Sequence, residues 1–290
     1  MLSQQLVNGI VLGSTYALIA LGYTMVYGII ELINFAHGEI YMFGAFVAML
    51  LVTIYKVPFL LSLLVAMALS SLLGVTIEFL AYRPLRRAPR LAALISAIGA
   101  SIFLQNLALF IMGPRPYNFP SPFERRVFNL EIFAISQIEL YILLISFFLM
   151  LGLHFLIMKT KLGKAMRATA QDKDTAALMG INIDKVISAT FLIGSAFGAA
   201  SGVMIGVYFR SVSPTMGLMP GLKGFVAAVL GGIGNIPGAM LGGLLLGVAE
   251  TMGAAYLSSQ YRDAVAFAIL IVVLILKPSG LLGKMVQDKV

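Results

Sequence analysis

The stretch "LVNGIVLGSTYALIALGYTMVYGII" (residues 6–30) decides the fold class, because it contains no charged residue. A helix needs ~20 apolar residues to cross the hydrocarbon core of a bilayer, and this run is long enough. A second apolar run begins at Ile40. Between the two lies "INFAHGE" (33–39), which places an amide, an imidazole and a carboxylate between segments suited to lipid. The sequence therefore predicts a membrane-spanning chain with a polar interruption after its first helix.

The composition of the whole chain agrees with a membrane protein. It has 290 residues, of which 60% are hydrophobic and only 11% charged, whereas soluble domains carry roughly 25% charged residues. The absence of cysteine removes disulfides, zinc–thiolate sites and cysteine nucleophiles. The net charge of +8 comes from basic residues in short loops, which is a topology signal rather than the long basic helix of a nucleic-acid binder. The start, MLSQQLVNGI, has none of the features of a signal peptide.

Apolar segments of membrane length predict an all-α polytopic helix bundle of about eight or nine spans, formed by residues 1–290 as a single transmembrane domain. The segments are 6–30, 40–56, 58–82, 91–112, 139–158, 186–209, 222–235, 237–257 and 264–277. The seventh and ninth are short, and the seventh runs into "LGGIGNIPG" (230–238). This pattern indicates a broken or re-entrant helix at that place, with the "INFAHGE" and "GGIGNIPG" breaks both inside the bundle.

Three basic stretches predict the orientation. Residues 83–90, 159–185 and 277–290 hold 13 of the 20 basic residues, and basic loops face the cytoplasm. The helix count then places the amino terminus outside and the carboxyl terminus in the cytoplasm. The longest outer connection is 113–138, which contains four prolines and is either a simple linker or a docking surface.

Glycines spaced four residues apart predict close helix packing, because they lie on one helix face and let two backbones approach in lipid. Gly243 with Gly247, and Gly9 with Gly13, repeat this spacing. The main packing candidates are Gly194, Gly198, Gly202, Gly206, Gly234, Gly238 and Gly242. This pattern favours a compact bundle and does not by itself indicate a function.

Polar groups inside apolar segments are the candidates for a translocation path or gate, because such groups are costly in hydrocarbon unless they face the bundle interior or water. They are Asn34, His37, Gly38, Glu39, Gln105, Asn106, Asn235 and Glu250. A metal site or a catalytic centre is disfavoured, because the HGE sequence is not the HExxH of zinc proteases and the serines lack an obvious base. We therefore predict no metal, no cofactor and no enzymatic activity in this chain.

Residues 159–185 form a polar stretch that is too regular for a simple loop. Alanines alternate with charges between Gly163 and Gly180, which predicts one short amphipathic helix over 164–180 lying parallel to the membrane. Two interpretations stay open, an interfacial anchor and a docking helix for a cytoplasmic partner.

Several motifs resemble the bacterial high-affinity branched-chain amino acid ABC transporter permease of the LivH type. They are "NGIVLGSTYALIALGYTMVYGIIELINFAHGEIYMFGAF" (8–46), "RPLRRAPRLAALISAIGASIFLQN" (83–106), "GKAMRATAQDKDTAALMGINIDKV" (163–186) and "AAVLGGIGNIPGAMLGGLLLGVAE" (227–250). The third is similar to the family's ATPase-coupling segment, with matching residues Gly163, Arg167, Ala170, Asp172, Ala176, Gly180 and Ile181. The loop 113–138 departs most from the family.

The resemblance implies a subunit of the bacterial inner membrane for import of leucine, isoleucine and valine. It would work with a second permease of the LivM type, two cytoplasmic ATPases and a periplasmic or lipid-anchored substrate-binding protein. The absence of a GxxxxGK[ST] phosphate loop agrees with ATP hydrolysis on other chains. Permeases for urea and short-chain amides are similar and stay open as an alternative. Two other classes compete, an ion-driven transporter using Glu39 and Glu250 and an intramembrane enzyme using His37 and Glu39. The coupling-type segment favours the ATP-driven class.

Overall fold

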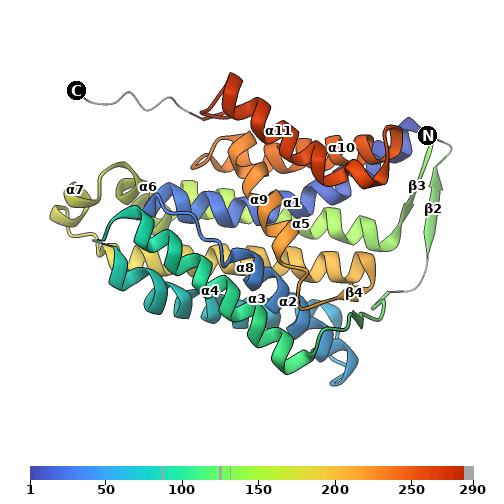
Figure 1. Ribbon diagram of the computed structural model, residues 1–290, viewed down its shortest axis with the longest axis horizontal. Helices are drawn as coiled ribbons and strands as arrows, with labels where there is room; N and C mark the ends of the chain where they lie inside the picture. Colours follow the sequence, from blue (N-terminus) through green and yellow to red (C-terminus); the bar gives the residue numbers. More distant parts are fainter. Residues whose placement is uncertain (87, 124–125, 131, 284–290) are drawn as a thin grey trace.

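The structure is a computed structural model that describes residues 1–86, 88–123, 126–130 and 132–283 (Figure 1). Helices dominate it, and short strands occur only in connections. The α-helices are α1 (Leu2–Ile30), α2 (His37–Thr53), α3 (Phe59–Ile77), α4 (Arg90–Met112), α5 (Gln137–Lys159), α6 (Lys161–Gln171), α7 (Lys173–Leu178), α8 (Ile183–Phe209), α9 (Leu218–Gly231), α10 (Ile236–Tyr256) and α11 (Arg262–Leu276). A π-helical turn, Glu78–Tyr82, and a 3-10 turn, Arg83–Leu85, extend α3, and another 3-10 turn, Ser259–Tyr261, precedes α11.

Membrane-spanning length separates these helices into two groups. Among the described residues, 7 helices are long and apolar enough to cross a bilayer, so the all-helical membrane bundle is confirmed with fewer full-length spans than the predicted eight or nine. The ninth segment, expected to be short, reaches spanning length as Ser259–Leu276. The second and seventh are the short ones, with 17 residues in α2 and 14 in α9. At ~1.5 Å per residue, neither covers the ~30 Å of a hydrocarbon core.

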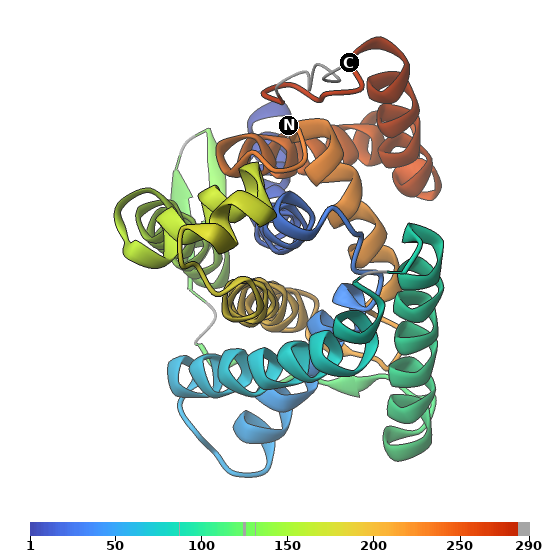
Figure 2. The same ribbon diagram turned by 90° about the vertical axis from the view of Figure 1, so that its left-hand side faces the viewer.

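The bundle is built around α1 and α8, which lie at its centre when viewed along the helices (Figure 2). Of the most apolar window of α1, 94% is buried, whereas only 6% of the windows in α4 and α11 is buried. Figure 2 shows α4 and α11 at the periphery. Their exposed apolar side chains are suited to contact lipid or a partner helix, because a surface in water rarely exposes large apolar patches.

Small residues explain why the central helices lie so close. A Cβ at Gly202 of α8 would clash with the backbone carbonyl of Tyr41 in α2, and a Cβ at Gly247 of α10 would clash with the backbone of Gly13 in α1. Bulkier residues would force these helices apart, and in lipid close packing is the main attraction between helices. The glycine faces therefore bring α1, α2, α8 and α10 into backbone contact.

The two ends of the bundle differ in character. Residues 83–86, 159–183 and 277–283 lie at one end, here called the basic end, on the left in Figure 1. The amino terminus and the β2–β3 hairpin (Val127–Leu130 and Phe133–Ser136) lie at the opposite end. A second pair of strands, β1 (Tyr117–Asn118) and β4 (Ser211–Val212), ties the connection after α4 to the end of α8. These strands are a local departure from the all-α prediction.

Candidate functional site

The first helix interruption lies where the sequence placed it. Helix α1 ends at Ile30, and Glu31 adopts a left-handed conformation with φ of 61°. Residues 31–36 then run from the basic end back into the bundle, so that α2 begins at His37 within it (Figure 1). Asn34 holds this segment, because its Oδ1 accepts hydrogen bonds from the Ala36 backbone N–H and the Tyr82 hydroxyl, each at 3.1 Å. The side chain of Asn34 is thus used to shape the break.

A second interruption, which the sequence analysis missed, precedes α9. Residues 213–217 connect β4 to α9, and Gly217 lies directly against Gly38 at the start of α2. A Cβ on either glycine would clash with the carbonyl oxygen of the other. We call this contact the helix junction. It brings the amino-terminal ends of two short helices together, and each end carries partial positive charge from its helix dipole. The spacing of Gly217, Pro220 and Gly221 could have signalled it.

A polar cavity of about 160 Å³ lies at the helix junction. Its walls come from α1, the 31–36 segment, α4 and the starts of α2 and α9. The lining residues are Tyr23, Phe35, Gly38, Glu39, Ile98, Ser101, Ile102, Gln105, Gly217, Leu218, Gly221 and Leu222. This cavity therefore contains three of the predicted path residues, Gly38, Glu39 and Gln105.

An apolar cavity of about 260 Å³ adjoins it between α2, α3 and α4. Its lining residues are Glu39, Met42, Phe43, Phe46, Val47, Leu50, Leu73, Leu104, Leu107, Ala108, Ile111 and Met112. Glu39 is the residue that the two cavities share. A carboxylate thus stands where a polar space meets a hydrophobic one.

Glu39 is buried and incompletely paired. Only 2% of its surface is exposed. Its Oε1 accepts a hydrogen bond from the Ser101 hydroxyl at 3.3 Å, and its Oε2 has no hydrogen-bond partner among the described residues. Glu39 lies in the first turn of α2, where the helix dipole stabilises a negative charge. The side chain is therefore suited to bind a cation that comes from outside the chain.

Glu250 was placed in the same path by the sequence, but the structure surrounds it with partners. Its Oε1 lies 2.9 Å from the Lys223 Nζ and 3.4 Å from the Arg262 Nε, and its Oε2 accepts from the Tyr16 hydroxyl at 2.9 Å. Asp263 also pairs with Lys223, at 2.7 Å. These five residues form what we call the Glu250 cluster, which joins α9 to α1, α10 and α11. Lys223 was missed, although a lysine in an apolar segment is itself a signal.

Three further predicted path residues lie elsewhere. His37 is buried between α1 and α8, in a space that Gly22 and Gly198 leave open, and it lines neither cavity. Asn106 is exposed on α4, and its amide donates to the Ile102 carbonyl at 2.8 Å. Asn235 accepts from the Gly238 N–H at 2.9 Å and so caps α10. Each of these contacts is local or structural.

The "GGIGNIPG" stretch was predicted to be a break inside the bundle, and this is wrong. It forms the tight turn between α9 and α10, with Gly232 and Gly234 at φ of 102° and 89°. The Asn235 amide also donates to the Leu282 carbonyl at 2.7 Å, which ties the turn to the segment after α11. Turn geometry of this kind requires glycine, because side chains disfavour positive φ. Gly234 therefore serves the turn, whereas Gly238 and Gly242 pack against α9.

The segment predicted as one amphipathic helix over 164–180 forms two helices. Asp172 divides α6 from α7, because its side chain accepts from the Thr175 N–H at 3.0 Å and caps α7. Gly163 packs against the end of α5, and Arg167 donates to the Ile157 carbonyl, so both hold α6 to α5. Gly180, at φ of 84°, ends α7. A capping residue inside the pattern is what separated the two helices.

Burial varies along this segment. Ala176 is buried within the chain and Ala170 is exposed. Ile181 is half-buried at the start of the connection to α8. At the end of α7, Leu178 and Met179 are exposed by 88% and 79%, which leaves an apolar tip on an otherwise polar segment.

Two routes of contact join this segment to the first interruption. The Lys173 Nζ in α7 donates to the Ile30 carbonyl at the end of α1, at 3.4 Å. In the second route, Asp184 at the start of α8 pairs with Arg83, at 2.7 Å, and with Arg86, which also pairs with Glu78 in the π-helical turn. That turn carries Tyr82, whose hydroxyl holds Asn34.

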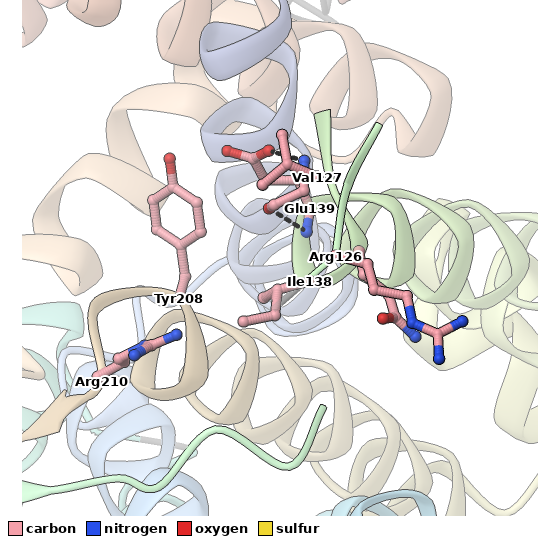
Figure 3. Close-up of a pocket in the computed structure, with 8 residues that line it drawn as sticks. Arg126, Val127, Ile138, Glu139, Tyr208 and Arg210 are labelled. Carbon is pink, nitrogen blue, oxygen red and sulfur yellow. Dashed lines mark hydrogen bonds between the residues drawn. The ribbon is translucent and has the colours of Figure 1, made fainter. Parts of the chain in front are cut away.

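A third cavity, of about 320 Å³, lies at the end opposite the basic end and shares no residue with the other two. Figure 3 shows Tyr208 and Arg210 on one side of it and Val127, Ile138 and Glu139 on the other. Its lining residues come from the 113–138 region, the start of α5 and the end of α8. Among the residues described, no group of three or more His, Cys, Asp and Glu could hold a metal ion.

Comparison with known proteins agrees with this architecture. The profile of the family described as "Branched-chain amino acid transport system / permease component" matches residues 5–274. The permease LivH of the high-affinity branched-chain amino acid transport system of Escherichia coli (strain K12) is 48% identical, covering 99% of this chain and 97% of the relative. BraD of Pseudomonas aeruginosa, with the corresponding description, is also 48% identical over the same shares.

More distant similarities extend over most of the chain. A probable LivH permease of Methanocaldococcus jannaschii is 26% identical over 95% of this chain and 91% of its own length. The solved structure of PsaBC from Streptococcus pneumoniae in complex with Fab has a TM-score of 0.51 at 12% identity, covering 96% of this chain and 92% of that one, which shows a shared fold. The profile match and the 48% identity to full-length relatives show that this chain belongs to the family of permease components of branched-chain amino acid transport systems.

Proposed function

We propose that this chain forms half of the translocation pathway of an ATP-driven importer for leucine, isoleucine and valine. Its expected partners are a second permease of the LivM type, two cytoplasmic ATPases and a periplasmic or lipid-anchored binding protein. The observation that carries the proposal is the 48% identity to permeases of high-affinity branched-chain amino acid systems across 99% of the chain. The chain would act as one domain, residues 1–290, in the inner membrane.

The proposed path runs past the helix junction. Interrupted helices whose amino-terminal ends meet inside a bundle are the usual way for a transporter to expose backbone polar groups to a substrate. The polar and apolar cavities there suit a substrate with a charged head and an aliphatic tail. We therefore keep Gly38, Glu39 and Gln105 as path residues and assign Asn34 to shaping the break.

The proposed coupling surface is the apolar tip of α7. Leu178 and Met179 are exposed where a groove on an ATPase would cover them. Movement of this tip would reach the 31–36 break through Lys173 and Ile30, and through Asp184, the two arginines, Glu78 and Tyr82. In this orientation the basic end is cytoplasmic and the amino terminus is outside. The cavity drawn in Figure 3 would then face the binding protein.

Reconstitution tests the proposed function. Proteoliposomes are prepared with this chain, the second permease, the ATPases and the binding protein, and ATP is supplied on the side that carries the ATPases. We expect them to accumulate leucine only when this ATP is present. This chain alone, under a proton gradient, is expected to show no uptake. Gradient-driven uptake by the isolated chain would instead favour an ion-driven transporter. Uptake that urea or acetamide inhibits and isoleucine does not would favour the amide class.

The coupling proposal has its own test. Replacing both Leu178 and Met179 with Ser removes the apolar tip without filling or emptying the interior. We expect ATPase recovery with solubilised permease to fall about tenfold, because truncating exposed anchors at an interface typically costs ~1–2 kcal/mol. Replacement of Tyr256 and Leu257, two exposed apolar residues at the opposite end of the bundle, by Ser is the control. Equal ATPase recovery in both variants would leave the segment as an interfacial anchor.

A further inference from the structure

We propose that Glu39 is the counter-ion for the ammonium group of the transported amino acid. In this arrangement the substrate carboxylate faces the amino-terminal ends of α2 and α9 in the polar cavity, and the substrate side chain occupies the apolar cavity. The inference rests on the proposed function, because it assigns a substrate site within that transporter.

The state of Glu39 is the first support. A carboxylate buried in a membrane bundle is costly unless it is paired or faces water. Within the described part of the chain, Ser101 supplies one hydrogen bond to Oε1 and nothing pairs with Oε2. The unpaired oxygen lies on a residue that lines both cavities. A small cation with hydrogen-bond donors would complete its coordination, and an alkylammonium group has three such donors.

The helix junction is the second support. The ends of α2 and α9 lie together, and each presents the partial positive charge of its helix dipole, which favours an anion. A simple anion would be repelled by Glu39, and a simple cation would gain nothing from the helix ends. A zwitterion satisfies both, because its carboxylate and its ammonium group are held two bonds apart on one carbon. The combination therefore selects an α-amino acid over a fatty acid or an amine.

The apolar cavity is the third support. Its volume is about 260 Å³, and apart from Glu39 every lining residue is apolar. An aliphatic side chain would leave no polar group unpaired there, whereas a charged or amide side chain would lose its hydrogen bonds to water without replacement. Ala108 is the smallest lining residue, so it is the position where added volume would shorten the space available.

The charge of Glu39 is tested in the complete transporter, reconstituted in proteoliposomes with the wild-type binding protein. Because every variant receives substrate from the same binding protein, differences between variants report the permease. We expect Glu39→Gln to lower ATP-driven leucine uptake at least tenfold while the ATPases and second permease still co-purify. Glu39→Asp, which keeps the charge, is expected to retain several times more uptake than Glu39→Gln. Equal uptake by Glu39→Gln and the wild type would overturn the inference, as would a Gln variant more active than the Asp variant.

The shape of the apolar cavity gives a second readout, which a purely structural role of Glu39 would not move. Ala108→Leu adds volume inside the cavity, whereas Gly99→Leu adds the same side chain on α4 where a Cβ meets nothing within 4 Å. We expect Ala108→Leu to lower the ratio of leucine to valine uptake by at least about threefold, since one methylene in an apolar pocket has effects of that order or larger. Gly99→Leu should leave the ratio unchanged. An unchanged ratio in Ala108→Leu would overturn the placement of the side chain.

Failure of the two proposals can be told apart. If the wild-type transporter shows no ATP-driven leucine uptake, the proposed function is wrong and this inference falls with it. If the wild type takes up leucine and the Glu39 and Ala108 variants behave like it, only this inference is wrong.

Discussion

Glu39 and Glu250 are both buried acids on apolar helices, yet they differ in how many partners surround the carboxylate. Glu250 meets a lysine, an arginine and a tyrosine hydroxyl, whereas Glu39 has one serine hydroxyl and an oxygen without a described partner. The first acid is at the centre of a cluster that joins four helices. The second stands between two cavities at the helix junction.

This difference separates a structural acid from one available to a ligand. Removing charges from water costs several kcal/mol per ion, and good pairing is needed to offset that cost. In the Glu250 cluster the chain supplies the pairing itself and thereby holds the short helix α9 in place. At Glu39 the chain supplies only the Ser101 hydrogen bond and the dipole of α2, which leaves this carboxylate available to a ligand. Substitutions in the Glu250 cluster should therefore lower stability, whereas substitution of Glu39 should lower transport. The opposite result at either acid would contradict this distinction.

The largest effect is expected from Lys223→Met. It leaves Glu250 buried beside one partly exposed arginine, and removal of one partner of a buried ion pair typically costs ~3–5 kcal/mol. We expect a large drop in the thermal stability of the detergent-solubilised transporter, measured by loss of monodisperse complex on heating. The double change Lys223→Met with Glu250→Met should recover most of it. A stable Lys223→Met protein would show that the cluster does not hold α9.

Next in size is Tyr16→Phe, which removes one hydrogen bond to Glu250. Hydrogen bonds to charged groups contribute ~1.5–3 kcal/mol, so the same heating assay should show a clear loss of stability. The matched variant Tyr82→Phe removes a hydroxyl bonded to the neutral Asn34 and should cost only ~0.5–1.5 kcal/mol. Leucine uptake should nevertheless fall in Tyr82→Phe, because the break is then less firmly held. The opposite ranking of stabilities would contradict the structural role of the cluster.

The helix junction itself can be opened with Gly217→Ala. The new Cβ would clash with the Gly38 carbonyl, and overpacking of this kind costs ~1–3 kcal/mol. Because the strain is relieved by separating the starts of α2 and α9, we expect leucine uptake to fall more than thermal stability does. Gly99→Ala, where the Cβ meets open space, is the control. Wild-type uptake in Gly217→Ala would mean that the junction need not stay closed.

The smallest effect on stability is expected from Glu39→Gln. It exchanges an incompletely paired carboxylate for an amide of the same shape that can still accept from the Ser101 hydroxyl. The heating assay should therefore show less change than the ~0.5–1.5 kcal/mol of a lost hydrogen bond. Its effect belongs to transport. A destabilisation like that of Lys223→Met would remove the distinction between the two acids.

Much of the architecture was readable from the chain. The 6–30 run, the apolar segments and the basic stretches predicted a membrane bundle, and the polar residues at 33–39 marked the first interruption. The seventh segment was flagged as unusual, although the reason given for it, a break at "GGIGNIPG", was wrong. The true interruption lies before α9, at residues 213–217, which contain no charged group to draw attention to them.

What the sequence determined by itself is everything that depends on local pattern: which segments are apolar, how long they are, where glycines align and which family the motifs resemble. Pairing between distant residues was decided only by the tertiary structure. Glu39 and Glu250 received the same interpretation from the sequence, since each is an acid within or directly beside an apolar run. The partners that distinguish them lie far along the chain, with Tyr16 separated from Glu250 by 234 residues and Ser101 from Glu39 by 62. Local patterns carry no information about such contacts, because packing of helices in space brings them together.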